Sequence, residues 1–564
     1  MRKFLPVFIV AGLFFSCQRE EADAPFATDT DISVLPSTET KASDNGLLGW
    51  VALTGQTHIS AEEAQETALA TAMQMREVEG IVTKAPLKIG SIEVVKGDTR
   101  KPYVPTKGNA KPEQADVYIV NFANNQGYVV TSADRRVPSV LAYNSYGHLG
   151  DTISNPGQAI LFSYMQAYIE EQRATFEANK EKLATEAEEA IFKQLSKERQ
   201  AELIAKGYFD KEGKRTKTKY DGRGFFSVCP DSPFPPEFEH FDKNKDKKGE
   251  DPKHRIKEPG WADYDIKYGE WRTEYVKAPL LKTLWGQSGE YNNSVRLKCN
   301  NGEEAPVGCV ATAVGQLLAY HKKPAVFKGR IMHWDDITKI DSGDMFSSIY
   351  SHNVGDNATA KEDIQYLLAH LGDSGLLAMN YGCIADGGSG SNRALEALHS
   401  LGYNNALLMP YNVDQVVSEI RNNRPIYIQG YSYEISHTYT TGWWFWKKSQ
   451  TRYSYKEGHA WVLDGYVLRK RKITEYYINC PSSEEVKIVN DEKIELIHNN
   501  FGWGDSNDGT KYGVSGLDGF YANGTGWYHI SIFNTKGNKE SSNTYKSGTP
   551  MNFQYNKCII TNIY

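Results

Sequence analysis

The sequence predicts an α+β fold, with a small unit near the N-terminus and a large unit over residues 273–564. Three observations lead to this prediction. Signals for a helix and for a β-hairpin follow one another between residues 58 and 170. A long, highly charged segment then separates the two units. Beyond it, apolar runs, glycine turns and aromatic residues continue to residue 564, as expected of a domain with its own core.

The first 17 residues have the pattern of an export signal. Two basic residues precede an apolar run from Phe4 to Phe15, which is too short to span a bilayer. The run ends in FFSC, which resembles a bacterial lipoprotein signal with Cys17 as the lipidated residue. We therefore expect residues 1–17 to be a lipoprotein-type signal, with a plain cleaved signal as the alternative. The expected localisation is an exported outer-membrane or cell-surface lipoprotein, either anchored or released after maturation.

Residues 18–57 are rich in Thr, Ser, Asp and Ala and are expected to form a tether. Ser60 and Glu63 then form a capping box ahead of a helical pattern. The runs VYIVNF and GYVVTS are β-rich and are joined by Asn-Asn-Gln-Gly, which is a hairpin signal. These patterns predict a small α+β unit over residues 58–170.

Residues 171–272 carry many charges of both signs. From Ser163 to Gly207 the sequence favours helix but has sparse apolar residues, which predicts an exposed helical arm. The stretch from His240 to Arg255 lacks apolar anchors and is typical of a flexible linker that proteases can reach. We expect a helical arm followed by a linker.

Composition excludes several classes of function. The formal net charge of -6 argues against nucleic acid as a partner. The seven cysteines include no CxxC pair and no His/Cys cluster, so a zinc site is not expected. We expect no metal site and no cofactor. If Cys17 carries lipid and Cys309 stays free, the remaining cysteines are odd in number and cannot all pair. Their wide spacing is not that of a dense disulfide scaffold.

One cysteine has a special context. In APVGCVATAVGQLLAYHKKP, Cys309 follows Gly308 and begins an apolar pattern with helical spacing. Backbone N–H groups and the helix dipole at such an N-terminus favour a thiolate, which is the attacking species in cysteine catalysis. Cys309 is therefore a candidate nucleophile, and a small buried core cysteine is the alternative.

Three other motifs offer partners for such a nucleophile. His459 in EGHAWVLDGY opens an apolar strand pattern, which suits a rigidly held general base. Asn500 follows the strand pattern IELIH and supplies an amide oxygen that can orient an imidazole, as in Cys-His-Asn enzymes. Gln287 in LLKTLWGQSGEYN supplies an amide that can donate to an oxyanion. An ordinary strand-edge histidine and a turn glutamine are the alternatives.

The motifs LLKTLWGQ, VGCVATAVGQLLAYHKKP, GGSGSNRALEALHSLGY, GHAWVLDGY and NNFGWG stand in the order found in the streptopain family of secreted bacterial cysteine peptidases. The run VYIVNFANNQGYVVTSADRRVPSVLAY resembles the inhibitory propeptide of that family. The resemblance spans roughly residues 58–170 and 275–533. It implies a papain-like peptidase domain over residues 273–564, preceded by a small α+β propeptide domain over residues 58–170.

The resemblance also implies roles for single residues. Cys309 would be the nucleophile, His459 the general base, Gln287 part of the oxyanion hole and Asn500 the residue that orients His459. The small residues of GGSGSN would form a wall of the cleft, and two aromatic residues of the Asn500 loop would join them. The expected substrate-binding residues are Ser389, Gly390, Ser391, Phe501 and Trp503.

This chain departs from the family pattern in three places. Phe501 stands where the family usually has tryptophan, and it lacks an indole N–H. The segment from Asp505 to Tyr521 is longer than the family loop. A longer insertion, which includes the aromatic run from Trp443 to Trp446, precedes His459. These departures leave the substrate preference open.

The expected function is a secreted cysteine endopeptidase, made as a zymogen, that works through a Cys-His pair and a thioester intermediate. Its expected partners are protein or peptide substrates and its own propeptide, with the membrane reached only through the lipid anchor. Maturation is expected to be a cut within residues 172–272. The alternatives are a weakly active or inactive binding or inhibitory lipoprotein, another Cys-His acyl-transfer enzyme, and an added adhesion role for the aromatic insertion.

Overall fold

The computed structural model describes most of the chain beyond its N-terminal segment. The described residues are 52–53, 57–81, 86–97, 99–105, 115–149, 156–205, 207–216, 263–339, 357–383, 388–441, 448–478, 486–503, 525–535 and 553–564. Several sequence-based expectations lie outside them: the signal with Cys17, nearly all of the tether, the stretch from His240 to Arg255, the aromatic run from Trp443 to Trp446, and the loop 505–521. Within the described part, none of the helices has the length and apolar character needed to cross a bilayer.

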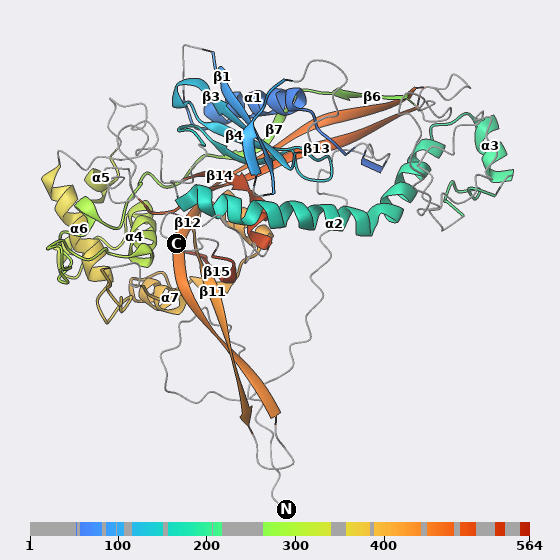
Figure 1. The fold of residues 1–564 in the computed structure, drawn as a ribbon. Coiled ribbons are helices and arrows are strands. Elements are labelled where there is room, and N and C mark those ends of the chain that lie inside the picture. Colours follow the sequence, from blue (N-terminus) through green and yellow to red (C-terminus); the bar gives the residue numbers. More distant parts are fainter. Residues whose placement is uncertain are drawn as a thin grey trace, which may run out of the picture.

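The N-terminal unit combines an antiparallel sheet with three helices (Figure 1). Its elements are α1 (Ala61–Val78), β1 (Ile89–Lys96), β2 (Thr99–Pro102), β3 (Val117–Phe122), β4 (Tyr128–Ser132), β5 (Val140–Asn144), α2 (Pro156–Phe192) and α3 (Lys197–Ala205). The Ser60 side chain accepts a hydrogen bond from the backbone N–H of Glu63 at 3.1 Å, which caps α1. The predicted helix start is confirmed.

The predicted hairpin is formed by β3 and β4, which pair in antiparallel register. Asn124 and Asn125 have positive φ angles in the connection, and Gly127 has a φ of 94°. A Cβ atom on Gly127 would lie 2.0 Å from the carbonyl oxygen of Asn144, so a side chain does not fit there. The hairpin prediction is confirmed, and its turn depends on this glycine.

The charged helical arm is only partly exposed, which corrects the expectation from the sequence. α2 is one helix of 37 residues, and its first turns are buried against the sheet through Ile160, Tyr164 and Tyr168. These residues recur every four positions and so share one face of the helix. Farther along, Phe192 stacks on Phe209 at a centroid distance of 4.3 Å in a separate small core that includes α3. The end of the arm therefore folds on itself.

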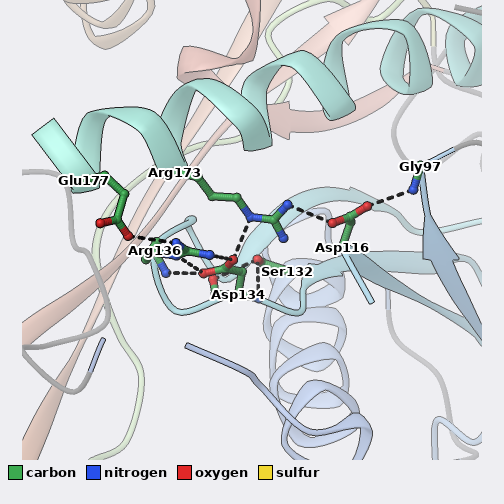
Figure 2. A network of polar contacts seen from close by, with 7 residues as sticks. All are labelled: Gly97, Asp116, Ser132, Asp134, Arg136, Arg173 and Glu177. Atoms are coloured by element: carbon green, nitrogen blue, oxygen red, sulfur yellow. Dashed lines mark hydrogen bonds and ion pairs between the residues drawn. The ribbon is translucent and has the colours of Figure 1, made fainter. Parts of the chain in front are cut away.

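A network of ion pairs fastens α2 to the N-terminal sheet (Figure 2). Arg173 on α2 donates to Asp134 at 2.7 Å and to Asp116 at 2.9 Å. Arg136 donates to Asp134 at 2.8 Å and to Glu177 on α2 at 3.0 Å. Burial alone would raise the pKa of Asp134, but the hydrogen bonds from the two arginines outweigh it and hold that pKa below its ordinary value. The network thus keeps a carboxylate charged between helix and sheet.

The C-terminal unit consists of helices packed beside a sheet with several long strands. Its elements are β6 (Asp263–Tyr268), β7 (Arg272–Lys277), α4 (Cys309–His321), β8 (Val326–Phe327), β9 (Arg330–Ile331), α5 (Trp334–Ile337), α6 (Ala358–Leu371), α7 (Ser391–Ser400), β10 (Leu407–Pro410), α8 (Val413–Arg421), β11 (Ile426–Thr441), β12 (Lys448–Ile478), β13 (Val486–Asn500), β14 (Gly526–His529) and β15 (Tyr555–Thr561). α4 lies in the apolar core between α6, α7 and the sheet. The predicted α+β class is confirmed.

Both units contribute to one sheet (Figure 1). Its strand order is β10-β15-β11-β12-β13-β14-β5-β4-β3-β1-β2, with β6 and β7 paired to β12. The junction lies between β14 and β5, where Trp527 pairs with Tyr143 and Tyr528 with Ala142. α1 covers this junction, because its buried alanines and Met75 pack with Leu496 and Trp527 of the C-terminal unit. The N-terminal unit is therefore joined by backbone pairing as well as by side chains.

Residues 263–272 are not a linker in the structure. They form β6 and the start of β7, which pair with β12 in antiparallel register. The sequence there alternates Tyr, Ile and Trp with charged residues, which is a strand pattern that the surrounding charge obscured. A cut that spares these strands has to fall before Asp263.

The insertion before His459 extends two strands of the sheet. β11 and β12 remain paired from the level of His459 out to Thr441 and Lys448. Figure 1 shows the resulting two-stranded ribbon projecting away from the body of the molecule. The strand that carries His459 is therefore continuous with this ribbon.

Candidate active site

Cys309 is the first residue of α4. Gly308 precedes it with a φ of 86°, a left-handed conformation that favours glycine. The helix that follows is buried over nearly its whole length, which fixes the position of its first residue. A disulfide between Cys299 and Cys383 ties the segment before α4 to the segment before α7. Among the described cysteines, Cys309 is the free thiol.

The thiol of Cys309 lies beside the strand that carries His459. The backbone N–H of Ala460, the residue after His459, hydrogen-bonds to it. Cys309 keeps some exposed surface, but protein atoms crowd the thiol. This burial raises the pKa of Cys309 above its ordinary value and outweighs the backbone N–H groups of Ala460 and Val310, which lower it. The thiol form is therefore favoured in this state, contrary to the thiolate expected from the helix N-terminus alone.

His459 is buried and has a fixed orientation. Its Nε2 atom lies 2.9 Å from the carbonyl oxygen of Phe501. Because a carbonyl oxygen only accepts, Nε2 carries a proton. Burial lowers the pKa of His459 to about 3, although the Phe501 carbonyl opposes this shift. The imidazole is thus neutral with an unprotonated Nδ1, which is the form that a general base needs.

Aromatic rings enclose the imidazole. Trp503 stacks on His459 at a centroid distance of 4.4 Å and an angle of 14°, and Trp461 lies parallel to it at 5.9 Å. Phe553 lies 5.2 Å away. Trp503 keeps partial exposure, so it remains available to a bound peptide. The rings exclude water from the imidazole and account for its lowered pKa.

The Phe501 side chain is buried, whereas the sequence suggested a residue of the cleft. Its side chain is 0% exposed and packs on Trp503 at 5.0 Å, with Trp461 and Tyr528 nearby. Phe501 lies in the apolar cluster that also receives the first turns of α2. Protein covers the Phe501 side chain completely in this state, so its role in binding substrate stays a prediction for the form without the N-terminal unit. Its contribution to the site is the main-chain carbonyl that holds His459.

Asn500 also has other partners than expected. Its Nδ2 donates to the carbonyl oxygen of Thr283 at 2.8 Å and to Gln316 Oε1 at 3.3 Å, and its Oδ1 accepts from Gln316 Nε2 at 3.3 Å. The group that orients the imidazole is the Phe501 carbonyl, so the predicted Asn500–His459 contact is corrected. Gln316 was missed by the sequence analysis. A lone amide within a uniformly apolar helix was the available signal, because a buried amide needs partners.

Gln287 is held next to the first turn of α4. Its carbonyl oxygen accepts from the N–H of Val307 at 2.8 Å, and the preceding carbonyl, that of Gly286, accepts from the Thr312 hydroxyl at 3.2 Å. Its own amide Nε2 donates to the carbonyl oxygen of Gly502 at 3.4 Å. Gln287 is partly exposed, so its amide is accessible from the site. Gln287 and Cys309 therefore lie on neighbouring segments, which these hydrogen bonds join both before and after Cys309.

The small-residue segment before α7 divides into two parts. Ser389 and Gly390 are partly exposed, and Gln429 on β11 donates to the carbonyl oxygen of Ser389 at 3.1 Å. Ser391 is the first residue of α7 and is 0% exposed. The assignment of Ser391 as a substrate-binding residue is therefore wrong in this state, because protein covers it completely. Ser389 and Gly390 remain candidates for the cleft wall.

The site as a whole brings a thiol, a neutral imidazole and a primary amide together beside β12, an interior strand of the central sheet. The helix supplies the thiol, the β12 strand supplies the imidazole, and the segment before α4 supplies the amide. This set of groups is suited to acyl transfer through a thioester.

Two families match the chain in the order that the motifs suggested. Residues 58–169 match the Spi protease inhibitor family, and residues 285–510 match the peptidase C10 family. The thiol protease/hemagglutinin PrtT of Porphyromonas gingivalis is 27% identical over 261 residues, which are 42% of this chain and 24% of PrtT. Streptopain of Streptococcus pyogenes is 21% identical over 350 residues, which are 56% of this chain and 65% of streptopain.

The chain thus spans about a quarter of PrtT and less than two thirds of streptopain. Among solved structures, a prointerpain A fragment of Prevotella intermedia aligns at a TM-score of 0.38 and 15% identity, covering 80% of this chain and 97% of the fragment. The two family matches cover both units of the fold, and the C10 match contains the candidate nucleophile and base. The chain therefore carries a domain of the peptidase C10 family, preceded by a domain of the Spi protease inhibitor family.

Proposed function

We propose that this chain is a cysteine endopeptidase made as an inactive precursor. The observation that carries the proposal is the placement of Cys309, at the start of α4, against the strand of His459, whose Nδ1 is unprotonated. Nδ1 takes the thiol proton as the sulfur attacks the carbonyl carbon of a peptide bond. The N–H of Cys309 and the amide of Gln287 stabilise the oxyanion.

The remaining steps follow from the same two residues. His459 returns the proton to the leaving amine as the C–N bond breaks, which leaves a thioester on Cys309. Water then attacks the thioester with His459 again as base, which releases the carboxylic acid and restores the thiol. Trp503, Ser389 and Gly390 border the substrate, whose identity is left to experiment.

The N-terminal unit acts as the intramolecular inhibitor in this proposal. The first turns of α2 pack into the same apolar cluster as Trp461 and Phe501, which support His459. Burial in that state favours the neutral thiol and imidazole over the ion pair. Removal of the N-terminal unit lets water reach the residues that support His459. The thiolate of Cys309 and the imidazolium of His459 then form more readily.

The proposal is tested with residues 18–564 as wild type and as Cys309→Ala. Wild type is expected to cleave casein and to shed an N-terminal piece by a cut before Asp263, whereas Cys309→Ala stays intact and inert. Casein cleavage and chain size are followed together over time. A Cys309→Ala protein that sheds the piece when pure would contradict self-processing. A wild type that stays inert after an external cut would favour the binding-protein alternative.

We also propose that the precursor is exported and lipidated on Cys17, on the basis of the N-terminal signal pattern. In a bacterial host fed a labelled fatty acid, the wild-type chain is expected to take up label and to sediment with membranes. The Cys17→Ala chain is expected to remain unlabelled, because it lacks the acceptor thiol. Equal labelling of both chains would refute lipidation at Cys17.

A further inference from the structure

We propose that Gln316 is a positioning residue for the Cys309–His459 reaction and acts through a reciprocal amide pair with Asn500. This inference rests on the proposed peptidase activity. Gln316 lies seven residues after Cys309 on α4, so the two are about 10 Å apart along the helix. Gln316 therefore does not reach the reacting atoms from its position. It reaches the segments that hold them.

The amide of Gln316 is fully buried, and both its oxygen and its nitrogen have hydrogen-bond partners. Its Oε1 accepts from the Thr283 hydroxyl at 3.0 Å and from the backbone N–H of Trp285 at 3.2 Å. Toward Asn500 it both accepts and donates, at 3.3 Å in each direction. This one side chain consequently joins α4 to two separate segments of the chain.

Each of these segments ends at a group of the site. Thr283 and Trp285 lead directly into Gln287, whose amide is assigned to the oxyanion. Asn500 directly precedes Phe501, whose carbonyl oxygen holds His459 Nε2 at 2.9 Å. Because α4 itself begins with Cys309, the hydrogen bonds of Gln316 fix the position of Cys309 relative to Gln287 and to the Phe501 carbonyl that holds His459.

Asn500 makes further hydrogen bonds to the same two segments. Its Nδ2 donates to the carbonyl oxygen of Thr283 at 2.8 Å, and its Oδ1 accepts from the N–H of Gly502 at 3.3 Å. The carbonyl of Gly502 in turn accepts from the Gln287 amide. The amide pair thus closes a loop of contacts through both sides of the site, which an apolar side chain cannot reproduce.

A purely structural role would give a different outcome from a positioning role. An apolar residue at 316 leaves the buried N–H of Trp285 and both polar groups of Asn500 with fewer partners. A positioning role predicts that this loss appears in kcat and in the pH dependence of kcat/KM, because Phe501 and Gln287 shift relative to Cys309. A structural role predicts a loss of stability only.

The test compares wild type with Gln316→Met, Gln316→Glu and Asn500→Ala, each freed of its N-terminal unit by the same external cut in the linker. Leu368→Ala is the matched control, because Leu368 is a fully buried residue of α6 that packs against α4 at Gly315. Steady-state kinetics on a short peptide are measured from pH 5 to 9, with active sites counted by an epoxide-type thiol inhibitor. Unfolding in denaturant is measured in parallel.

Gln316→Met is expected to lower kcat per active site by about 10- to 100-fold with KM changed less than threefold, and to shift the pH profile. The double variant Gln316→Met/Asn500→Ala should lose little more than the worse single variant, since the pair acts as a unit. If Gln316→Met does not fold, Gln316→Glu serves instead, since it keeps the length of the side chain and the Oε1 acceptor and replaces the –NH2 donor to Asn500 by a carboxyl oxygen. It is expected to lower kcat at least fivefold.

An active wild type with kcat and pH profile unchanged in the folded variants would overturn this inference alone. The same holds if Leu368→Ala loses as much kcat at equal loss of stability. A wild type that neither hydrolyses peptide nor reacts with the inhibitor would overturn the proposed function, and this inference with it.

Discussion

The His459→Ala variant is expected to lose at least about a thousandfold in kcat/KM for peptide hydrolysis, because it lacks the imidazole that takes the proton of Cys309 in the proposed mechanism. The structure gives His459 a fixed tautomer, with the proton on Nε2 and held by the Phe501 carbonyl at 2.9 Å. Its Nδ1 atom is therefore unprotonated and able to accept a proton. The rate is measured on a short peptide after removal of the N-terminal unit.

The matched control for this variant is His437→Ala. His437 is an exposed histidine of the β11–β12 ribbon and bonds to Ser454. It should keep the wild-type rate within about twofold. Alkylation of Cys309 by iodoacetamide near neutral pH should also slow in His459→Ala, because the thiol then loses its proton acceptor. Wild-type hydrolysis by His459→Ala would remove His459 from the mechanism.

The Glu79→Gln variant is expected to make the precursor more stable at neutral pH. Glu79 lies at the end of α1, where Trp527 Nε1 of the C-terminal unit donates to it at 2.8 Å and the Tyr143 hydroxyl at 3.3 Å. Burial raises the pKa of this carboxyl above its ordinary value of 4.5, against the opposing effects of Trp527, Ser145, His498 and Tyr143. Glutamine keeps an acceptor for Trp527 without the charge.

The sign of the pH dependence follows from this raised pKa. Below pH 4.5 the Glu79 carboxyl is protonated in both the folded and the unfolded chain, so wild type and the Glu79→Gln variant are both neutral at this position and should differ little in stability. Above pH 4.5 the unfolded chain releases the proton more readily than the folded one, and wild type loses stability relative to Glu79→Gln. The difference should grow by at most about 1.4 kcal/mol per pH unit, until the pH passes the pKa of the folded state.

The measurement is denaturant unfolding at pH 4, 5.5 and 7.5 in a Cys309→Ala background, which prevents self-cleavage. Glu66→Gln is the matched control, because Glu66 lies exposed on the same helix. The control should show no such trend. A stability difference for Glu79→Gln that is flat with pH, or that falls as pH rises, would contradict the burial of a carboxyl that prefers to be neutral.

The sequence was informative where the signal is local. The Ser60 cap, the β3–β4 hairpin and the start of a helix at Cys309 each depend on a few adjacent residues, and the structure has all three. Other features depend on pairing between distant residues. The junction of Ala142 with Tyr528 joins positions almost four hundred residues apart, and neither strand encodes its partner.

The sequence-based predictions for Asn500 and Phe501 differ from the structure because both residues contact partners that lie far away in the sequence. Successive residues of a strand point to opposite faces, so the position of Asn500 at the end of β13 does not reveal which neighbour its amide meets. Motif order suggested His459, whereas packing gave it Gln316. Phe501 was predicted to line the cleft because its loop borders the site, but its ring packs into an apolar cluster built from residues far apart in the sequence, which no local pattern reveals.

The junction of the two units also bears on solubility. As long as the N-terminal unit stays in place, β14 has β13 on one side and β5 on the other. Once the unit departs, the β14 side that faced β5 has backbone N–H and C=O groups without their partner, next to the aromatic surface of Trp527 and Tyr528. Such an edge is a template for pairing with other chains. We therefore expect the N-terminal unit to protect the C-terminal unit from self-association, and the form without it to be the more aggregation-prone.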